Sequence, residues 1–237
     1  MIKIFQPHLR FILYFVPFFL ILGIFGCFFS GCASRRPLQE PSEPIDIGLI
    51  LVMPFQNLYQ TCGIDGSFKC PFFGSMYEVD EVRDGADEFL TDQLFAHLKN
   101  EEKLSLIEPG QALGVRAAIL SESTGEMSEK ELVLEVARTV GAQSVILGRV
   151  FDYRERVGTA YSVDVAASVA FDIILLRVSD EKLLWADHFA EKQKPLSENL
   201  FLLGSFIKRG GRWLTADELA EFGLKQILKT FPDSMGQ

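Results

Sequence analysis

The chain has 237 residues, which is enough for one ordinary domain or at most two small ones, and 48% of its residues are hydrophobic. It carries 23 basic and 32 acidic residues, and once Lys3 and Arg10 near the amino terminus are set aside the remainder has a formal charge of −11. This acidity argues against a nucleic-acid partner, because phosphates require clustered basic side chains, and against purely electrostatic attachment to anionic lipid.

Residues 1–31 have the pattern of a secretory signal peptide. A start with two basic residues is followed at 11–29 by an apolar run without a single charge. The run ends in Phe-Ser-Gly-Cys at 29–32, which resembles the lipobox of bacterial lipoproteins, although Phe stands where Leu is usual. The resemblance implies cleavage before Cys32, which becomes the lipidated first residue. Cys27 is a weaker competitor, because Phe25 stands where that motif needs a small residue.

An uncleaved transmembrane helix is the alternative, since roughly 18 apolar residues can span a bilayer. We favour cleavage, because a spanning helix gives no reason for two small residues and a cysteine at its end. Acyl chains such as palmitate anchor strongly, at about 0.8 kcal/mol for each buried methylene. Ala33 stands where enterobacterial lipoproteins of the inner membrane carry Asp, so this resemblance implies the outer membrane, facing the periplasm. Anchoring in the inner membrane remains the alternative.

The rest of the chain divides into a tether and one domain. Residues 32–44 contain the lipidated cysteine and three prolines with almost nothing apolar, which is typical of an extended linker. Residues 45–232 form the expected domain. Its first half predicts a buried strand at 45–53, an amphipathic helix at 82–98, a short strand at 104–107 and a short helix at 111–120.

The second half of the domain has clearer signals. Ser128 and Glu131 have capping-box spacing before a helix that Gly141 closes, and Thr215 and Glu218 repeat this spacing before the last helix. Strict alternation at 161–177 predicts a long antiparallel strand with one buried and one polar face, paired with strands at 144–153 and 182–189. The expected fold class is α/β, a mixed and largely antiparallel sheet packed with amphipathic helices.

Four segments of the domain resemble a superfamily of periplasmic lipoprotein domains. They are residues 51–57, 86–98, 140–150 and 176–185, and the superfamily includes the amino-terminal domain of TolB, the curli-secretion lipoprotein CsgG and the cell-wall synthase activator LpoB. The resemblance implies the fold more than any one function. The sequence departs from the family in lacking a glycine at 180–182 and in carrying an insertion at 58–80.

The insertion holds the candidate partner-binding residues, because loops on a rigid scaffold often carry binding. Cys62 and Cys70 bracket seven residues within it, and an oxidising periplasm favours a disulfide between them. Such a bond contributes about 2 to 3 kcal/mol. A zinc site is disfavoured because no histidine lies nearby. The apolar residues around the pair either fold back onto the core or form an exposed recognition patch: Phe68, Phe72, Phe73, Met76 and Tyr77.

We find no catalytic constellation, metal site or cofactor motif in the sequence. No Ser or Cys stands in a nucleophile-elbow context, so a hydrolytic triad has no support. His97 and His188 are interpreted as structural. The acidic residues of the helix at 82–98 are interpreted as its solvated face, not as a carboxylate cluster: Asp84, Asp87, Glu88 and Asp92.

These observations favour a lipid-anchored, non-catalytic binding or scaffold module for an envelope protein, which the likeness to LpoB extends to activation of a cell-wall synthase. The alternative is a subunit of a CsgG-like secretion complex in the outer membrane, which needs amphipathic hairpins with lipid-facing bands. Only residues 161–176 alternate for long enough, and they are rich in Val and Ala instead of interface aromatics. An envelope hydrolase is the least supported reading.

Overall fold

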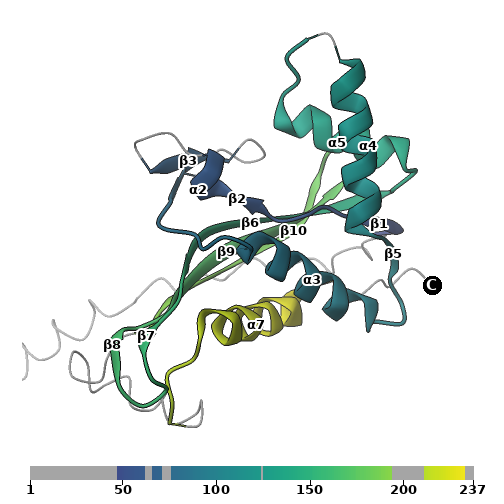
Figure 1. The fold of residues 1–237 in the computed structure, drawn as a ribbon. Coiled ribbons are helices and arrows are strands. Elements are labelled where there is room, and N and C mark those ends of the chain that lie inside the picture. Colours follow the sequence, from purple (N-terminus) through teal and green to yellow (C-terminus); the bar gives the residue numbers. More distant parts are fainter. Residues whose placement is uncertain (1–46, 62–65, 71–75, 124, 194–210, 233–237) are drawn as a thin grey trace, which may run out of the picture. The chain divides into compact units, whose positions relative to one another are not determined.

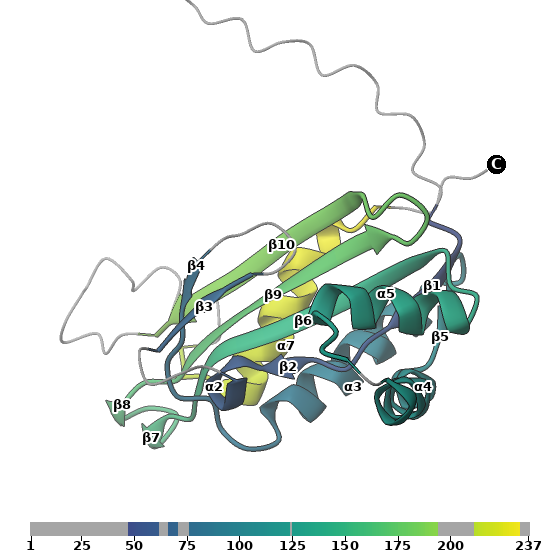
Figure 2. The same ribbon diagram turned by 90° about the horizontal axis from the view of Figure 1, so that it is seen from above.

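The centre of the fold is a mixed β-sheet with helices on both faces (Figures 1 and 2). A computed structural model of the chain describes residues 47–61, 66–70, 76–123, 125–193 and 211–232. Residues 1–43 separate from a compact unit that runs from Pro44 to Gln237. The predicted signal peptide, Cys32 and the whole of the predicted tether lie outside the described residues. Among the helices that are described, none is long and apolar enough to cross a membrane.

The strand order of the main sheet is β10-β9-β6-β1-β5, and β2 also pairs with β6. β1, β2 and β5 run parallel to their neighbours, whereas β6, β9 and β10 form an antiparallel meander. The bounds are β1 Leu49–Val52, β2 Gln56–Asn57, β5 Ser105–Ile107, β6 Ser144–Arg154, β9 Ser168–Arg177 and β10 Leu183–Lys192. The predicted α/β class with a mixed sheet is confirmed, as are the two predicted antiparallel pairings.

One face of the sheet is covered by α3, Ala86–Lys99, and α7, Ala216–Ile227, which lie side by side (Figure 1). The 3-10 turn η3, Leu228–Thr230, extends α7. Both helices bury the stripe that their spacing predicts, and side chains such as Leu90, Leu94 and Leu224 are fully buried against the strands. This face carries the largest part of the core.

The opposite face is covered in two parts. α5, Glu129–Thr139, packs over one half of it, and α4, Pro109–Glu122, lies outside α5 (Figure 2). The other half is covered by α2, Leu58–Thr61, and the hairpin of β3, Ser67–Lys69, and β4, Met76–Glu78. A second small hairpin, β7 Val157–Gly158 with β8 Val163–Val165, extends the β6–β9 connection.

The predicted helix ends are confirmed by their hydrogen bonds. The hydroxyls of Ser128 and Thr215 accept bonds from the amides of Glu131 and Glu218, and each glutamate accepts a bond from the backbone of its cap residue. Gly141 follows α5 at φ 73°, the left-handed conformation of a helix end. The turn before β10 uses the same left-handed backbone conformation without a glycine, because Glu181 adopts φ 58°.

Two sequence predictions are wrong in detail. Residues 161–177 are not one strand, because β8 ends at Val165 and β9 begins at Ser168. The predicted polar face of this segment is solvated only in part: Ser162 and Asp164 are exposed, whereas Ser168 and Asp172 are buried. The reason is that part of the insertion at 58–80 lies over this face, and Asp172 has an opposite charge beside it.

Candidate functional site

The described part of the insertion folds back onto the sheet. Phe68, in β3, is half-buried against a small cluster formed by Leu58, Phe151 and Ala170. Met76, at the start of β4, is 62% exposed. Phe72 and Phe73 lie outside the described residues, and Tyr77 is described only as a backbone position in β4. The predicted loop patch is therefore divided, with Phe68 serving the core and Met76 facing solvent.

A buried ion pair lies beneath this insertion. Arg149 of β6 and Asp172 of β9 are directly opposite one another, with 1% and 3% of their surfaces exposed. The guanidinium donates two hydrogen bonds to the carboxylate, Nε to Oδ1 at 2.9 Å and Nη2 to Oδ2 at 2.6 Å. Such a bidentate pair fixes both side chains, because two parallel bonds match the shapes of the two groups.

Cys70 connects the insertion to this pair. The residue follows β3, is buried, and its Sγ accepts a hydrogen bond from Arg149 Nη1 at 2.7 Å. Burial alone lowers the pKa of Arg149, but the charge of Asp172 and the bonds to Asp172 and Cys70 outweigh it, so the pKa is raised. Arg149 therefore stays a cation that holds the sheet and the insertion together. Cys62 lies outside the described residues, so the disulfide between Cys62 and Cys70 stays a prediction.

Sequence reasoning missed the Arg149–Asp172 pair. The signal was available, because each residue interrupts an otherwise apolar stretch of two strands that were expected to pair. A charged residue in the middle of a central strand is rarely buried without an opposite charge. Both charges are satisfied within the protein, since Arg149 donates to Asp172 and to Cys70, and we interpret the role of the pair as structural.

A second polar cluster joins β6 to the start of α7. Asp217 Oδ1 accepts hydrogen bonds from Tyr153 Oη at 2.5 Å and from Arg83 Nη2 at 2.6 Å. The guanidinium of Arg83 also lies over the Tyr153 ring, 5.1 Å from its centre. Burial and the bond to Asp217 raise the pKa of Tyr153. The phenol is therefore kept neutral and serves as a hydrogen-bond donor.

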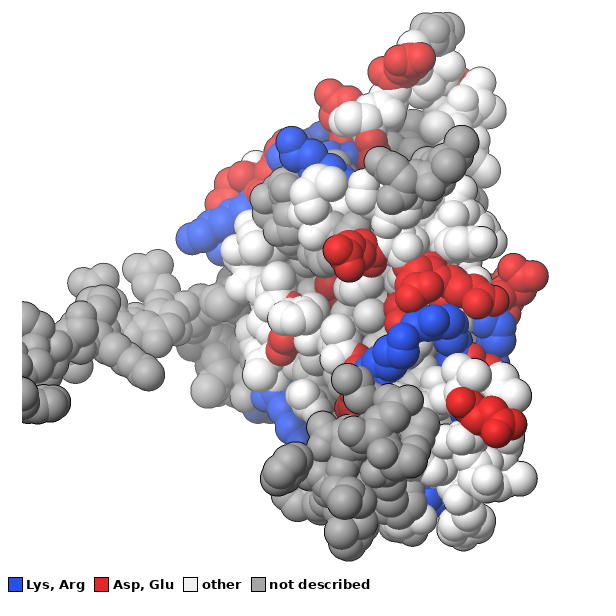
Figure 3. Space-filling view, turned by 90° about the vertical axis from the view of Figure 1, so that its left-hand side faces the viewer, with Lys and Arg blue, Asp and Glu red and all other residues white. Residues whose placement is uncertain are grey.

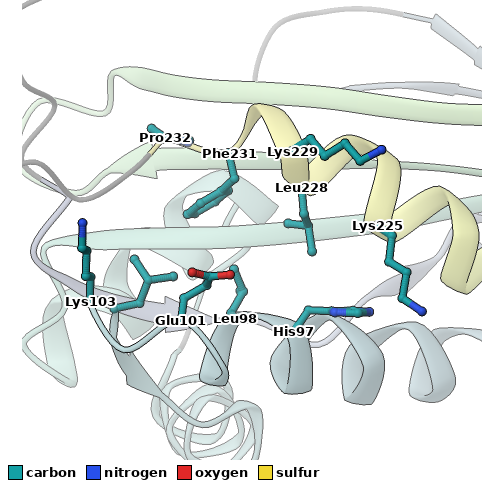
Figure 4. A pocket seen from close by; sticks show the side chains of 10 residues that line it. His97, Leu98, Glu101, Lys103, Lys225, Leu228, Lys229, Phe231 and Pro232 are labelled. Atoms are coloured by element: carbon teal, nitrogen blue, oxygen red, sulfur yellow. The ribbon is translucent and has the colours of Figure 1, made fainter.

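Figure 4 shows a cavity of about 330 Å³ between the carboxyl-terminal ends of α3 and α7. Its apolar wall includes Leu98 and Phe231, and the Nε2 atom of His97 is buried there without a hydrogen-bond partner among the described residues. The amino groups of Lys225 and Lys229 do not converge on one point in Figure 4. The cavity therefore offers apolar surface and one imidazole, without the focused charge that would hold an anion.

The remaining predicted residues occupy separate places. His188 is exposed on β10. Among the acidic residues of the α3 region, Asp84, Glu88 and Asp92 are exposed and Asp87 is half-buried, which confirms a largely solvated face. Within the described ranges, no three His, Cys, Asp or Glu side chains gather where they could hold a metal ion.

Figure 3 shows acidic and basic side chains next to one another, with no continuous basic area on the described part of that face.

No protein-family model matches the chain, and no curated protein matches its sequence. Solved structures similar to the chain include the following three. The LpoB C-terminal domain from Salmonella enterica is 17% identical with a TM-score of 0.37, and the match covers 62% of this chain and 84% of that one. The PelC dodecamer from Paraburkholderia phytofirmans is 13% identical with a TM-score of 0.39, and the match covers 81% of this chain and 94% of that one. The lipoprotein GNA1162 from Neisseria meningitidis is 15% identical with a TM-score of 0.36, and the match covers 77% of this chain and 98% of that one.

All three TM-scores lie below 0.5, so the resemblance of the chain to TolB, CsgG and LpoB stays a prediction.

Proposed function

We propose that this protein is a lipoprotein of the bacterial envelope whose domain is a non-catalytic binding module for another envelope protein. The observation that carries the proposal is the sequence Phe-Ser-Gly-Cys at 29–32 after a cationic start and an uncharged apolar run. Lipidation at Cys32 anchors the chain, and the proline-containing residues to 44 give the domain reach from the membrane surface. The outer membrane, with the domain in the periplasm, is the proposed location.

The domain supports a binding role because its strongest polar groups are committed to its own structure. Arg149 and Asp172 neutralise each other under the insertion, and Tyr153 donates to Asp217 instead of serving as a base. The sheet and its helices form a rigid scaffold on which exposed side chains keep fixed positions. Activation of a cell-wall synthase is one form that such binding can take.

The alternative of a CsgG-like secretion subunit is not supported by its one candidate for a lipid-facing strand. That candidate was a single long alternating strand at 161–176, with one face free to contact lipid. The structure divides this segment between β8 and β9, and β9 is buried along both faces except at its last residue. We therefore keep the binding module as the proposed function.

The anchor is tested by the intact mass of the protein purified from membranes, compared with a Cys32→Ala variant. We expect a mature chain that begins at Cys32 and carries added acyl mass, and a variant that lacks this mass and leaves the membrane fraction. A full-length, unmodified chain would contradict the lipoprotein proposal, because it would show an uncleaved membrane helix.

The binding role is tested by photo-crosslinking in the living cell. A photoreactive amino acid is placed at exposed positions of the domain, one at a time, and cross-linked products are identified by mass spectrometry. We expect one envelope protein to be captured from a group of neighbouring positions and not from the opposite side of the domain. Capture of nothing at any position, with the protein folded and anchored, would refute the binding role.

A further inference from the structure

Helix α4 has an unusual combination of composition and burial. Between Pro109 and Ser121 its only charged residue is Arg116, yet Ala112 is the only residue of α4 that is buried. A helix that is apolar on all sides is normally covered on all sides. Figures 1 and 2 place α4 at the periphery of the described fold, where it packs against α5 and β1 and leaves its outer side open.

The open side of α4 is one continuous uncharged face. At 100° per residue, six positions fall within one arc of about 120°, which begins about 80° from the direction of Ala112 and extends past the opposite side of the helix. They are Gly110, Leu113, Gly114, Ala117, Leu120 and Ser121. Leu113 and Leu120 are 50% and 49% exposed, and a Cβ at Gly110 or Gly114 would meet no atom within 4 Å. Small residues between two leucines let another helix approach closely.

Both ends of this face are acidic. At the start of α4, a cavity of about 320 Å³ is lined by Asp87, Glu88 and Asp92 of α3 together with Leu113, and no Lys or Arg lines it. At the other end, a shallow cavity of about 630 Å³ contains four glutamates and one arginine. This cavity lies between the end of α4, the loop after it and α5, and its residues Glu122 and Glu126 are exposed just beyond the outer face of α4. The face thus runs for about 17 Å, with carboxylates of α3 near its start and Glu122 and Glu126 beyond its end.

We propose that this face of α4 binds a cationic amphipathic helix of a partner protein, an inference that rests on the proposed binding function. The matching helix carries an apolar stripe of about 12 residues with Lys or Arg at each end, so that its charges reach the carboxylates near the two ends of α4. A second copy of the chain is a poorer occupant, because antiparallel pairing of two α4 helices places acidic ends beside acidic ends. An anionic membrane surface is disfavoured for the same reason.

The test uses the full lipidated chain in phosphatidylcholine nanodiscs and a fluorescent 20-residue peptide with a central Leu stripe and three Lys at each end. Fluorescence anisotropy measures binding, with empty nanodiscs as the blank. We expect the double variant Leu113→Ser, Leu120→Ser to bind about thirtyfold more weakly, because each half-exposed leucine loses apolar burial in the complex. The matched control is Val157→Ser, Val165→Ser, which removes two equally exposed side chains from the β7–β8 hairpin and should change nothing.

Charge is tested separately. Glu122→Gln with Glu126→Gln should weaken binding and reduce its salt dependence, and a peptide with Glu in place of each Lys should not bind. Equal binding of the acidic peptide, equal binding to empty nanodiscs, or an unchanged affinity of the double leucine variant would overturn the proposal. So would a dimer, seen by sedimentation, that the leucine variant abolishes, because the occupant would then be a second copy.

The same leucine variant separates this inference from the proposed function. If cross-linking in cells captures an envelope protein and the variant captures it equally well, the α4 site is wrong and the binding function stands. If neither form captures a protein, the binding function itself fails. Loss of capture in the leucine variant, with capture retained in the Val157 and Val165 control, supports both.

Discussion

Replacement of Asp172 by Asn should destabilise the domain strongly, although the two side chains have nearly the same shape. Asp172 is 3% exposed and accepts two hydrogen bonds from Arg149, which is 1% exposed. The amide removes the negative charge and leaves a buried cation without compensation. Breaking a buried pair in this way costs about 3 to 5 kcal/mol. That is a large part of the roughly 5 to 15 kcal/mol that stabilises a typical domain.

The loss is measurable by urea unfolding of the chain from residue 33, followed by circular dichroism and by the fluorescence of Trp185 and Trp213. We expect a lower midpoint with an unchanged slope, since the surface exposed on unfolding stays the same. In thermal unfolding the same change corresponds to a fall of roughly 6 to 20 °C for a domain of this size.

The double variant Arg149→Met, Asp172→Leu distinguishes a buried charge from lost packing. Because it removes both charges and fills the space with apolar atoms, it should lie within about 1 kcal/mol of the wild type or above it. Cys70→Ala, measured under reducing conditions so that no disulfide to Cys62 contributes, controls for the lost Arg149–Sγ bond and should cost about 1 kcal/mol. A cost below 1 kcal/mol for Asp172→Asn, or a double variant whose cost equals the sum of its two single variants, would refute this reasoning.

Two further predictions concern packing and pH. Gly148→Ala should cost about 1 to 3 kcal/mol in urea unfolding, because its Cβ would collide with the Phe55 ring. Gly114→Ala, whose Cβ meets open space, should be neutral or stabilise α4 by up to about 1 kcal/mol. Burial and the bond to Asp217 raise the pKa of Tyr153, so the stabilisation from its neutral form is complete below pH about 10 and is lost as pH rises further. Absorbance at 295 nm should show this phenol ionising only with unfolding, and Tyr153→Phe should abolish that alkaline loss.

Local signals predicted most of the fold correctly. The capping boxes at Ser128 and Thr215 are confirmed because they depend on residues three positions apart, which the sequence shows directly. The buried stripes of α3 and α7 and the meander of β6, β9 and β10 are confirmed for the same reason, since a periodic pattern reports which side of an element is covered.

The errors come from contacts that are distant in the sequence. The alternation at 161–177 predicts a solvated face correctly only if nothing covers that face, and the cover comes from residues about one hundred positions earlier. Phe68 and Cys70 are drawn to the sheet by Phe151 and Arg149, which no local pattern around the insertion shows. The sequence predicts only a short helix at 111–120, because its open outer face depends on where α5 and β1 place it.

The position of the insertion also changes where a partner is expected to bind. Its described part is held down by Phe68 and by the bond between Cys70 and Arg149, and a segment that completes the core is not free to change its contacts when a partner arrives. The outer face of α4 has no such commitment, because Leu113 and Leu120 stand half-exposed on a regular helix whose backbone is already ordered. Binding there requires no ordering of the chain, so more of the apolar burial is available as affinity. A partner helix is therefore expected to use α4 as its main contact.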